Sequence, residues 1–210
     1  MSMRESGNGW SSAARVVSGI FHPFLLPCYF LVGLLFTDIM PPVAGTPVRL
    51  YLAAVIILNM LVIPAAFVWM MRAIGLLKDF SLSTRRERML PLLVVAVCYG
   101  LCAWMLAGTP VTFLLRRFLL VGMWCVLFAL TVNFKWQISL HTTAAGGIAG
   151  TLLVLVYVGY GDLVWILCGS LAVAGLLASS RLELGRHDPA QVAAGFMGGA
   201  AVAALTVVLV

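Results

Sequence analysis

The chain alternates between long apolar runs and short polar segments. A helix needs about 20 apolar residues to cross the hydrocarbon core of a bilayer. Seven runs approach or exceed that length: residues 21–37, 50–73, 89–107, 114–134, 143–160, 163–180 and 190–210. They lack the ten-residue alternation of barrel strands, and only helices or closed barrels satisfy their backbone polar groups in lipid. The pattern predicts an all-α fold, a polytopic transmembrane helical bundle of about seven spans.

The first run differs from the others. It contains Pro23 and Pro27 and is the least regular of the seven. Residues 1–20 form a polar N-terminal segment that lacks the ordered n-region, h-region and cleavage site of a signal peptide. We therefore expect the first run to be retained as a span, and residues 1–210 to form a single integral membrane domain.

Composition supports the membrane assignment. Hydrophobic residues make up 63% of the chain and charged residues 10%, whereas soluble domains contain about 25% charged residues. A water-soluble fold of 210 residues cannot bury so much apolar surface. The formal net charge of +6 is a weak indication of an anionic partner, because membrane proteins carry basic loops in any case. Nucleic acid is not an expected partner.

The cysteines do not suggest a metal or redox centre. All five lie inside apolar runs: Cys28, Cys98, Cys102, Cys125 and Cys168. Such cysteines act as small apolar packing residues, because a metal site needs more polar neighbours. We expect no metal site and no cofactor.

Two runs are rich in small residues. Gly146 with Gly150, and Gly195 with Gly199, form small-xxx-small pairs that allow helix backbones to approach closely. These pairs fit packing inside the bundle, and they also fit a homodimer interface.

The polar residues fall into three segments, and their positions are informative because intramembrane polar groups are rare. The segments are residues 78–91, 135–143 and 180–191. An even number of crossings separates each segment from the next, so all three emerge on one face of the membrane. That face collects arginines, histidines and a serine. Arginine matches phosphate geometry, and a histidine of near-neutral pKa acts as a nucleophile or a general acid.

Two of these segments resemble motifs of the type 2 phosphatidic acid phosphatase (PAP2) superfamily. The family's third motif is S-R-x5-H-x3-D, and Ser180, Arg181 and His187 match it closely. The second motif is P-S-G-H, which Ser139 and His141 match at two positions.

The first segment matches the family's K-x6-R-P motif less well. Lys78 and Arg85 have the required spacing, but Arg86 stands where the family has proline. Arg88, with Pro91 nearby, is the alternative to Arg85. Many members place the first two motifs in one loop, whereas two apolar runs separate them here. The resemblance covers residues 78–191, with the motifs in the family's order.

The resemblance implies a fold, a mechanism and a set of roles. The fold is a six-helix core, here with one additional span. His187 would attack phosphorus to form a phosphohistidine, and His141 would protonate the leaving oxygen. The phosphoryl oxygens would be held by Lys78, Arg85 or Arg88, Arg181 and Ser139. No metal takes part in this family, and the expected substrate is a lipid phosphate or lipid pyrophosphate in the bilayer.

Two departures fall inside the matching motifs. Leu140 replaces the glycine of the second motif, and Gln191 replaces the aspartate that orients the nucleophile. Glutamine can accept a hydrogen bond from His187 but contributes no charge. Asp188, Pro189 and Gln191 also form the pattern of a helix start with a capping box, so Gln191 has two candidate roles.

The charge distribution bears on the orientation. With seven spans, the motif face carries ten lysines and arginines and the opposite face carries three. The positive-inside rule then places the motifs in the cytoplasm, whereas resemblance to bacterial members favours the outer face. The expected location is a bacterial inner (cytoplasmic) membrane.

Three functions are compatible with this pattern. The first is a phosphatase acting on a lipid phosphate or pyrophosphate. The second is a catalytically weak lipid-phosphate binder on the same scaffold, which the changes at Gln191 and Leu140 favour. The third is a small anion transporter, which the absence of paired broken spans argues against.

Overall fold

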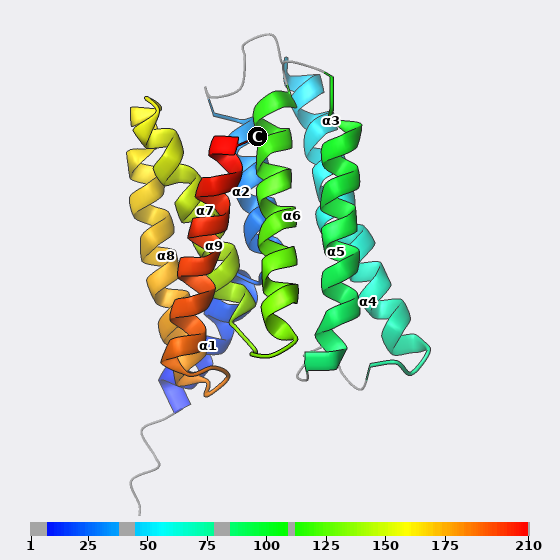
Figure 1. Cartoon of the computed structure of the whole chain (residues 1–210), viewed down its shortest axis with the longest axis vertical. Coiled ribbons are helices and arrows are strands. Elements are labelled where there is room, and N and C mark those ends of the chain that lie inside the picture. Colours follow the sequence, from blue (N-terminus) through cyan, green and yellow to red (C-terminus); the bar gives the residue numbers. More distant parts are fainter. Residues whose placement is uncertain (1–7, 38–44, 78–84, 109–111, 210) are drawn as a thin grey trace, which may run out of the picture.

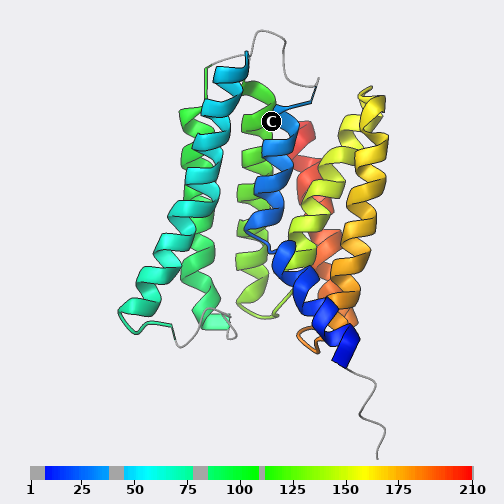
Figure 2. The same ribbon diagram turned by 180° about the vertical axis from the view of Figure 1, so that it is seen from behind.

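The protein is a helical bundle, as the computed structural model in Figures 1 and 2 shows. The structure describes residues 8–37, 45–77, 85–108 and 112–209, and these contain no strand. The principal helices are α1 (Asn8–Ile20), α2 (Leu25–Leu35), α3 (Thr46–Ile57), α4 (Ile63–Ala73), α5 (Arg85–Met105), α6 (Phe113–Asn133), α7 (Leu140–Tyr157), α8 (Val164–Glu183) and α9 (Pro189–Leu209). The predicted all-α fold is confirmed.

Six continuous helical stretches are long and apolar enough to cross a membrane. They are Thr46–Ala73, Arg85–Met105, Phe113–Asn133, Leu140–Tyr157, Gly161–Glu183 and Pro189–Leu209. Helices α1 and α2 supply a seventh span if the bent pair crosses as one unit. The protein is therefore an integral membrane protein with six such helices, or the predicted seven spans if the bent pair crosses as one.

The first span differs from the sequence expectation. Residues 21–37 were expected to form one span after a polar segment, but α1 already begins at Asn8 and meets α2 at a 54° bend. Pro23 lies in the break, where it provides no backbone N–H and its ring disfavours a continuous helix. Helix α1 is amphipathic: Ala14 and Ser18 are buried, while Trp10 is exposed.

The span from α3 to α4 contains a second irregularity. The short π-helical segment η1 (Leu58–Val62) joins these helices just before Pro64. Pro64 has no N–H to donate to the preceding turn, and a π-turn is a common way to accommodate such a gap. Met60 of η1 consequently points into the bundle and is buried.

The three polar segments reach the same end of the bundle. The starts of α5, α7 and α9 lie together at the lower end in Figure 1, beside the end of α8 and the start of α1. The chain's C-terminus lies at the opposite end. The parity of the spans therefore places the described parts of the three segments on one face, as expected.

Helices α7 and α9 pack at very short range because both carry glycine at their contact. A Cβ atom at Gly146 would collide with the carbonyl oxygen of Phe196, and one at Gly150 would collide with that of Ala200. In the other direction, a Cβ at Gly199 would meet the Thr143 carbonyl. These small-xxx-small pairs serve packing within the bundle. Their close contact fixes the start of α7 against the start of α9, where the candidate site lies.

Candidate functional site

His187 lies in the tight turn that joins α8 to α9. Gly185 adopts φ +59°, and the Gly185 N–H donates to the Leu182 carbonyl while the Arg186 N–H donates to the Arg181 carbonyl. This is the hydrogen-bond pattern of a Schellman motif, which reverses the chain at a helix C-terminus. The reversal places His187 above the last turn of α8, where only 8% of its surface is exposed.

Gln191 holds the ring of His187 in one orientation. The Gln191 Oε1 atom lies 2.9 Å from His187 Nδ1 and also accepts from the Asp188 N–H at 3.3 Å. Asp188 Oδ1 in turn accepts from the Gln191 N–H at 2.8 Å. Because Oε1 is an acceptor, the proton of the neutral ring lies on Nδ1 in this contact, and the lone pair is then on Nε2.

The two candidate roles of Gln191 are therefore not alternatives. One oxygen closes the capping box of α9 and also accepts from His187, in a single side-chain conformation. The cap fixes Gln191, and Gln191 fixes the ring, so the start of α9 positions the histidine.

Cations surround His187 in the described part of the chain. Arg181 in the last turn of α8 and Arg88 near the start of α5 both act electrostatically on His187. Arg88, Arg181 and Arg186 are also close enough to repel one another. Three neighbouring guanidinium groups favour a bound anion, because an anion relieves their mutual repulsion and matches their donors.

Arg181 also presents an unused donor. Its Nε atom is buried and has no hydrogen-bond partner within the described residues. Buried donors are rarely left unpaired, and an unpaired one calls for a specific explanation. A phosphoryl oxygen beside His187 would satisfy this N–H.

The protonation of His187 is set by opposing influences. Burial lowers its pKa from the ordinary value, and the charges of Arg181 and Arg88 lower it further. Hydrogen bonds to Gln191 and to the backbone of Gln137 act in the opposite direction. The net pKa is lowered, so the ring is neutral at pH 7.

The two alternative arginines of the first motif have different surroundings. The Arg85 side chain is exposed and donates to the Lys135 carbonyl at 2.7 Å, while the Arg85 carbonyl accepts from Asn133 Nδ2 at 3.0 Å. Arg85 therefore ties the start of α5 to the turn between α6 and α7. Arg88 is the residue that interacts with His187 and Arg181. Lys78 lies outside the described residues.

Ser139 is the N-cap of α7. It is fully buried, and its Oγ accepts from the Thr142 N–H at 3.5 Å. Its own N–H donates to the Gln191 carbonyl at 3.3 Å. Ser139 thus caps α7 and connects it to α9 through the backbone. The phosphate contact that the motif implies for Ser139 stays a prediction.

His141 lies in the first turn of α7 and faces α1. Its Nε2 atom is 3.1 Å from the Ser18 carbonyl oxygen. The ring also contacts His22 edge-on, with centroids 5.7 Å apart. Because a carbonyl oxygen only accepts, Nε2 carries a proton and Nδ1 is the atom that can exchange one. His141 also interacts electrostatically with Arg181 and His187.

Sequence reasoning did not assign Ser18 or His22 to the site. His22 was visible as a histidine before Pro23 on the motif face, but its contact with His141 depends on the α1–α2 bend. Ser18 acts through its backbone carbonyl, which a helix ending at Ile20 leaves without an N–H partner four residues on. No side-chain pattern could have revealed it.

The candidate site thus brings together His187, Gln191, Arg181, Arg88 and His141 from four helices and one turn. Within the described residues there is no group of three or more His, Cys, Asp or Glu side chains able to hold a metal ion. Comparisons with protein-family models, with curated proteins and with solved structures found no match to this chain.

Proposed function

We propose that this protein is a membrane phosphatase that hydrolyses a lipid phosphate or lipid pyrophosphate through a phosphohistidine on His187. The observation that carries the proposal is the environment of His187: a buried imidazole with Nδ1 fixed by Gln191, beside two arginines, one of which has an unpaired buried donor. A neutral nucleophile among cations suits a phosphorus centre with several anionic oxygens.

The proposed reaction has two steps. Nε2 of His187 attacks phosphorus, the bond from phosphorus to the lipid oxygen breaks, and His141, which enters this step protonated at both ring nitrogens, gives its Nδ1 proton to that oxygen and becomes neutral. Water then attacks the phosphohistidine, His141 takes a proton from this water, and inorganic phosphate leaves as His187 recovers its lone pair. Arg181 and Arg88 stabilise the charge on the equatorial oxygens in both steps.

The membrane setting supports a lipid substrate. All of the site residues lie at helix ends or in a turn, at the end of the bundle where headgroups would meet them (Figure 1). We place the protein in a bacterial inner membrane with the site on the cytoplasmic face, because the lysines and arginines concentrate at this end.

The test is phosphate release by purified protein from a panel of lipid phosphates and pyrophosphates, without added metal. We expect turnover by the wild type. For His187→Ala we expect a loss of about 10³-fold or more, which is the scale for removing a nucleophile. Arg181→Ala should lose about 10²-fold, the scale for one oxyanion donor. Unchanged turnover in His187→Ala would refute the proposal.

Gln191 supports a second candidate, a lipid-phosphate binder without turnover. The neutral amide orients His187 but supplies no charge to stabilise the imidazolium that forms during attack. The same panel separates the two functions. Folded protein that binds lipid phosphate, in a manner that Arg181→Ala weakens, but that releases no phosphate would establish the binder.

A further inference from the structure

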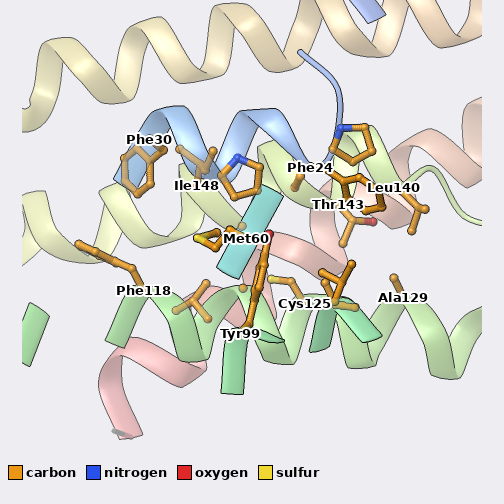
Figure 3. Close-up of a pocket in the computed structure, with 18 of the residues that line it drawn as sticks. Phe24, Phe30, Met60, Tyr99, Phe118, Cys125, Ala129, Leu140, Thr143 and Ile148 are labelled. Atoms are coloured by element: carbon orange, nitrogen blue, oxygen red, sulfur yellow. The ribbon is translucent and has the colours of Figure 1, made fainter. Parts of the chain in front are cut away.

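A cavity lies inside the helical bundle (Figure 3). It is partly open to the outside, and about 730 Å³ of empty space lies within it and in its opening together. Residues of α2, η1, α5, α6 and α7 line it. Phe30 and Phe118 lie at one end, Ala129 and Leu140 at the other, and Met60 and Tyr99 between them.

The wall of the cavity is almost entirely hydrocarbon. Three of its polar side chains are used within the bundle: Thr143 donates to the Ser139 carbonyl, Thr151 to the Gly147 carbonyl, and the Cys125 thiol to the Gly199 carbonyl. The Tyr99 hydroxyl is the other polar group of the lining. Cavities with apolar walls stay dry and take up apolar ligands.

The cavity begins one helical turn after Arg88, at Leu92. On α5, Arg88 interacts with His187, and Leu92, Val95 and Tyr99 follow it at one-turn intervals and line the cavity. Residues at this spacing share one helix face. On α7, the lining residue Leu140 stands between Ser139 and His141. One surface therefore changes from guanidinium to hydrocarbon within a single helical turn.

We propose that this cavity holds a hydrocarbon tail of the substrate whose phosphate lies between Arg88, Arg181 and His187. The inference rests on the phosphate site proposed above. Five elements line the cavity with hydrocarbon, and the substrate class that we assign to it is a single-chain lipid phosphate or pyrophosphate, such as a prenyl or monoacyl phosphate. The second chain of a two-chain lipid would remain outside the bundle.

Leu140 would contact the tail of the substrate in this arrangement. The second motif of the resembling family has glycine there, and here the leucine side chain forms the end of the cavity nearest the site. It presents an apolar surface to the first carbons of the tail, directly beside the turn that holds His141.

The experiment is photo-crosslinking in lipid nanodiscs with a single-chain alkyl phosphate that carries a diazirine along its tail, mapped by mass spectrometry. We expect labels on α5, α6 and α7 residues of the cavity. A probe with the same tail and a hydroxyl head, and the Arg181→Ala variant with the phosphate probe, should each give at least tenfold less cavity label. Equal labelling by both probes would mean that any bilayer chain fills the cavity, and would overturn the proposal.

A blocking variant provides the control for position. Ala129 is 1% exposed and lines the end of the cavity beside Leu140, so Ala129→Phe should reduce the cavity label at least tenfold. Ala144→Leu, at a partly buried lining position, serves if Ala129→Phe does not fold. Ala172→Phe, on the exposed face of α8, should label like the wild type. Labels confined to outward-facing residues, or unaffected by the blocking variants, would refute the inference.

The outcome is separable from that of the proposed function, because crosslinking reports binding and not turnover. Cavity labelling that depends on the phosphate head, without phosphate release, would support the tail site and refute the proposed hydrolase activity. Phosphate release without cavity labelling would support the hydrolase activity and refute the tail site.

Discussion

His187 owes its chemistry to neighbours from three different elements. Gln191 of α9 fixes which ring nitrogen carries the proton, while Arg181 of α8 and Arg88 of α5 lower the pKa of the ring together with burial. A neutral ring with an oriented lone pair is the form that attacks phosphorus. Activity should therefore persist below pH 6.5, the ordinary pKa of histidine, and fall only as the pH drops through the lowered pKa.

Replacing Gln191 by glutamate tests whether the pKa of His187 controls the rate. The capping box survives, because glutamate is a usual residue at this position of the box, but the acceptor becomes charged and raises the pKa of His187. We expect the acidic limb of the pH profile of kcat/KM to move to higher pH. At pH 8 kcat should rise by about fivefold to tenfold, since a charge-assisted hydrogen bond gains about 1 kcal/mol over a neutral one.

The matched control is Gln191→Leu, which has a similar volume but no acceptor. It should lower kcat and also cost about 1 kcal/mol of stability through loss of the cap. An acidic limb that stays in place in Gln191→Glu would show that the rate does not depend on the protonation of His187.

Several site residues could be predicted from the sequence, and others could not. The spacing of Arg181 and His187 is local, fixed by one helix end and one turn, so a motif captures it. The choice between Arg88 and Arg85 depends on which face of the first turn of α5 is turned towards His187, which spacing alone does not determine. The sequence allowed Gln191 both roles only in different rotamers, because spacing alone does not show that the turn places His187 Nδ1 and the Asp188 N–H within reach of one oxygen.

At the scale of elements, the glycine contact of α7 with α9 carries the site. It brings Ser139 within hydrogen-bonding distance of Gln191, and Thr142 Oγ1 donates to the Val192 carbonyl at 3.0 Å. The glycine spacing indicated close packing of these two runs. The break between α1 and α2 was less predictable, because the apolar run alone did not show that a helix already begins at Asn8 and brings Ser18 to His141.

A pair of alanine substitutions tests the glycine contact. Gly146→Ala should destabilise the protein by about 1–3 kcal/mol, because its methyl group meets the backbone of Phe196, which cannot move aside as a side chain would. Gly169→Ala, on exposed α8 with nothing within 4 Å, should be neutral or stabilising by about 0.5–1 kcal/mol. Thermal unfolding in detergent measures both, and equal midpoints would contradict the packing.

At the scale of the whole molecule, the fold gathers the chemistry at one end. Composition and run length were sufficient to predict an all-α transmembrane bundle of about seven spans, because only helices or closed barrels satisfy their backbone polar groups in lipid. The structure has six long apolar helices, or seven spans with the bent pair. The parity of spans was sufficient to bring the polar segments to one face. The cavity could not be predicted, since it is formed by apolar side chains from five elements that resemble ordinary core residues in the sequence.

Cysteine labelling tests this topology. Lys135 and Arg186 are exposed at the site end and Asp162 at the other. In a background without native cysteines, Lys135→Cys and Arg186→Cys should react with an impermeant maleimide in inside-out vesicles, and Asp162→Cys in right-side-out vesicles. Reaction of positions 135 and 186 from opposite sides would contradict the fold. Reaction of both from the outer side would keep the fold and reverse the orientation.

A nucleophilic His187 passes through a phosphorylated form, and trapping that form tests its role. With p-nitrophenyl phosphate the leaving group needs little protonation, so His141→Ala should form the phosphohistidine but hydrolyse it slowly. Rapid quenching at alkaline pH followed by peptide mass spectrometry should then find phosphate on His187 in His141→Ala and none in the His141→Ala, His187→Ala double variant. Phosphate release by the wild type without any phosphate on His187 in these variants would contradict the account.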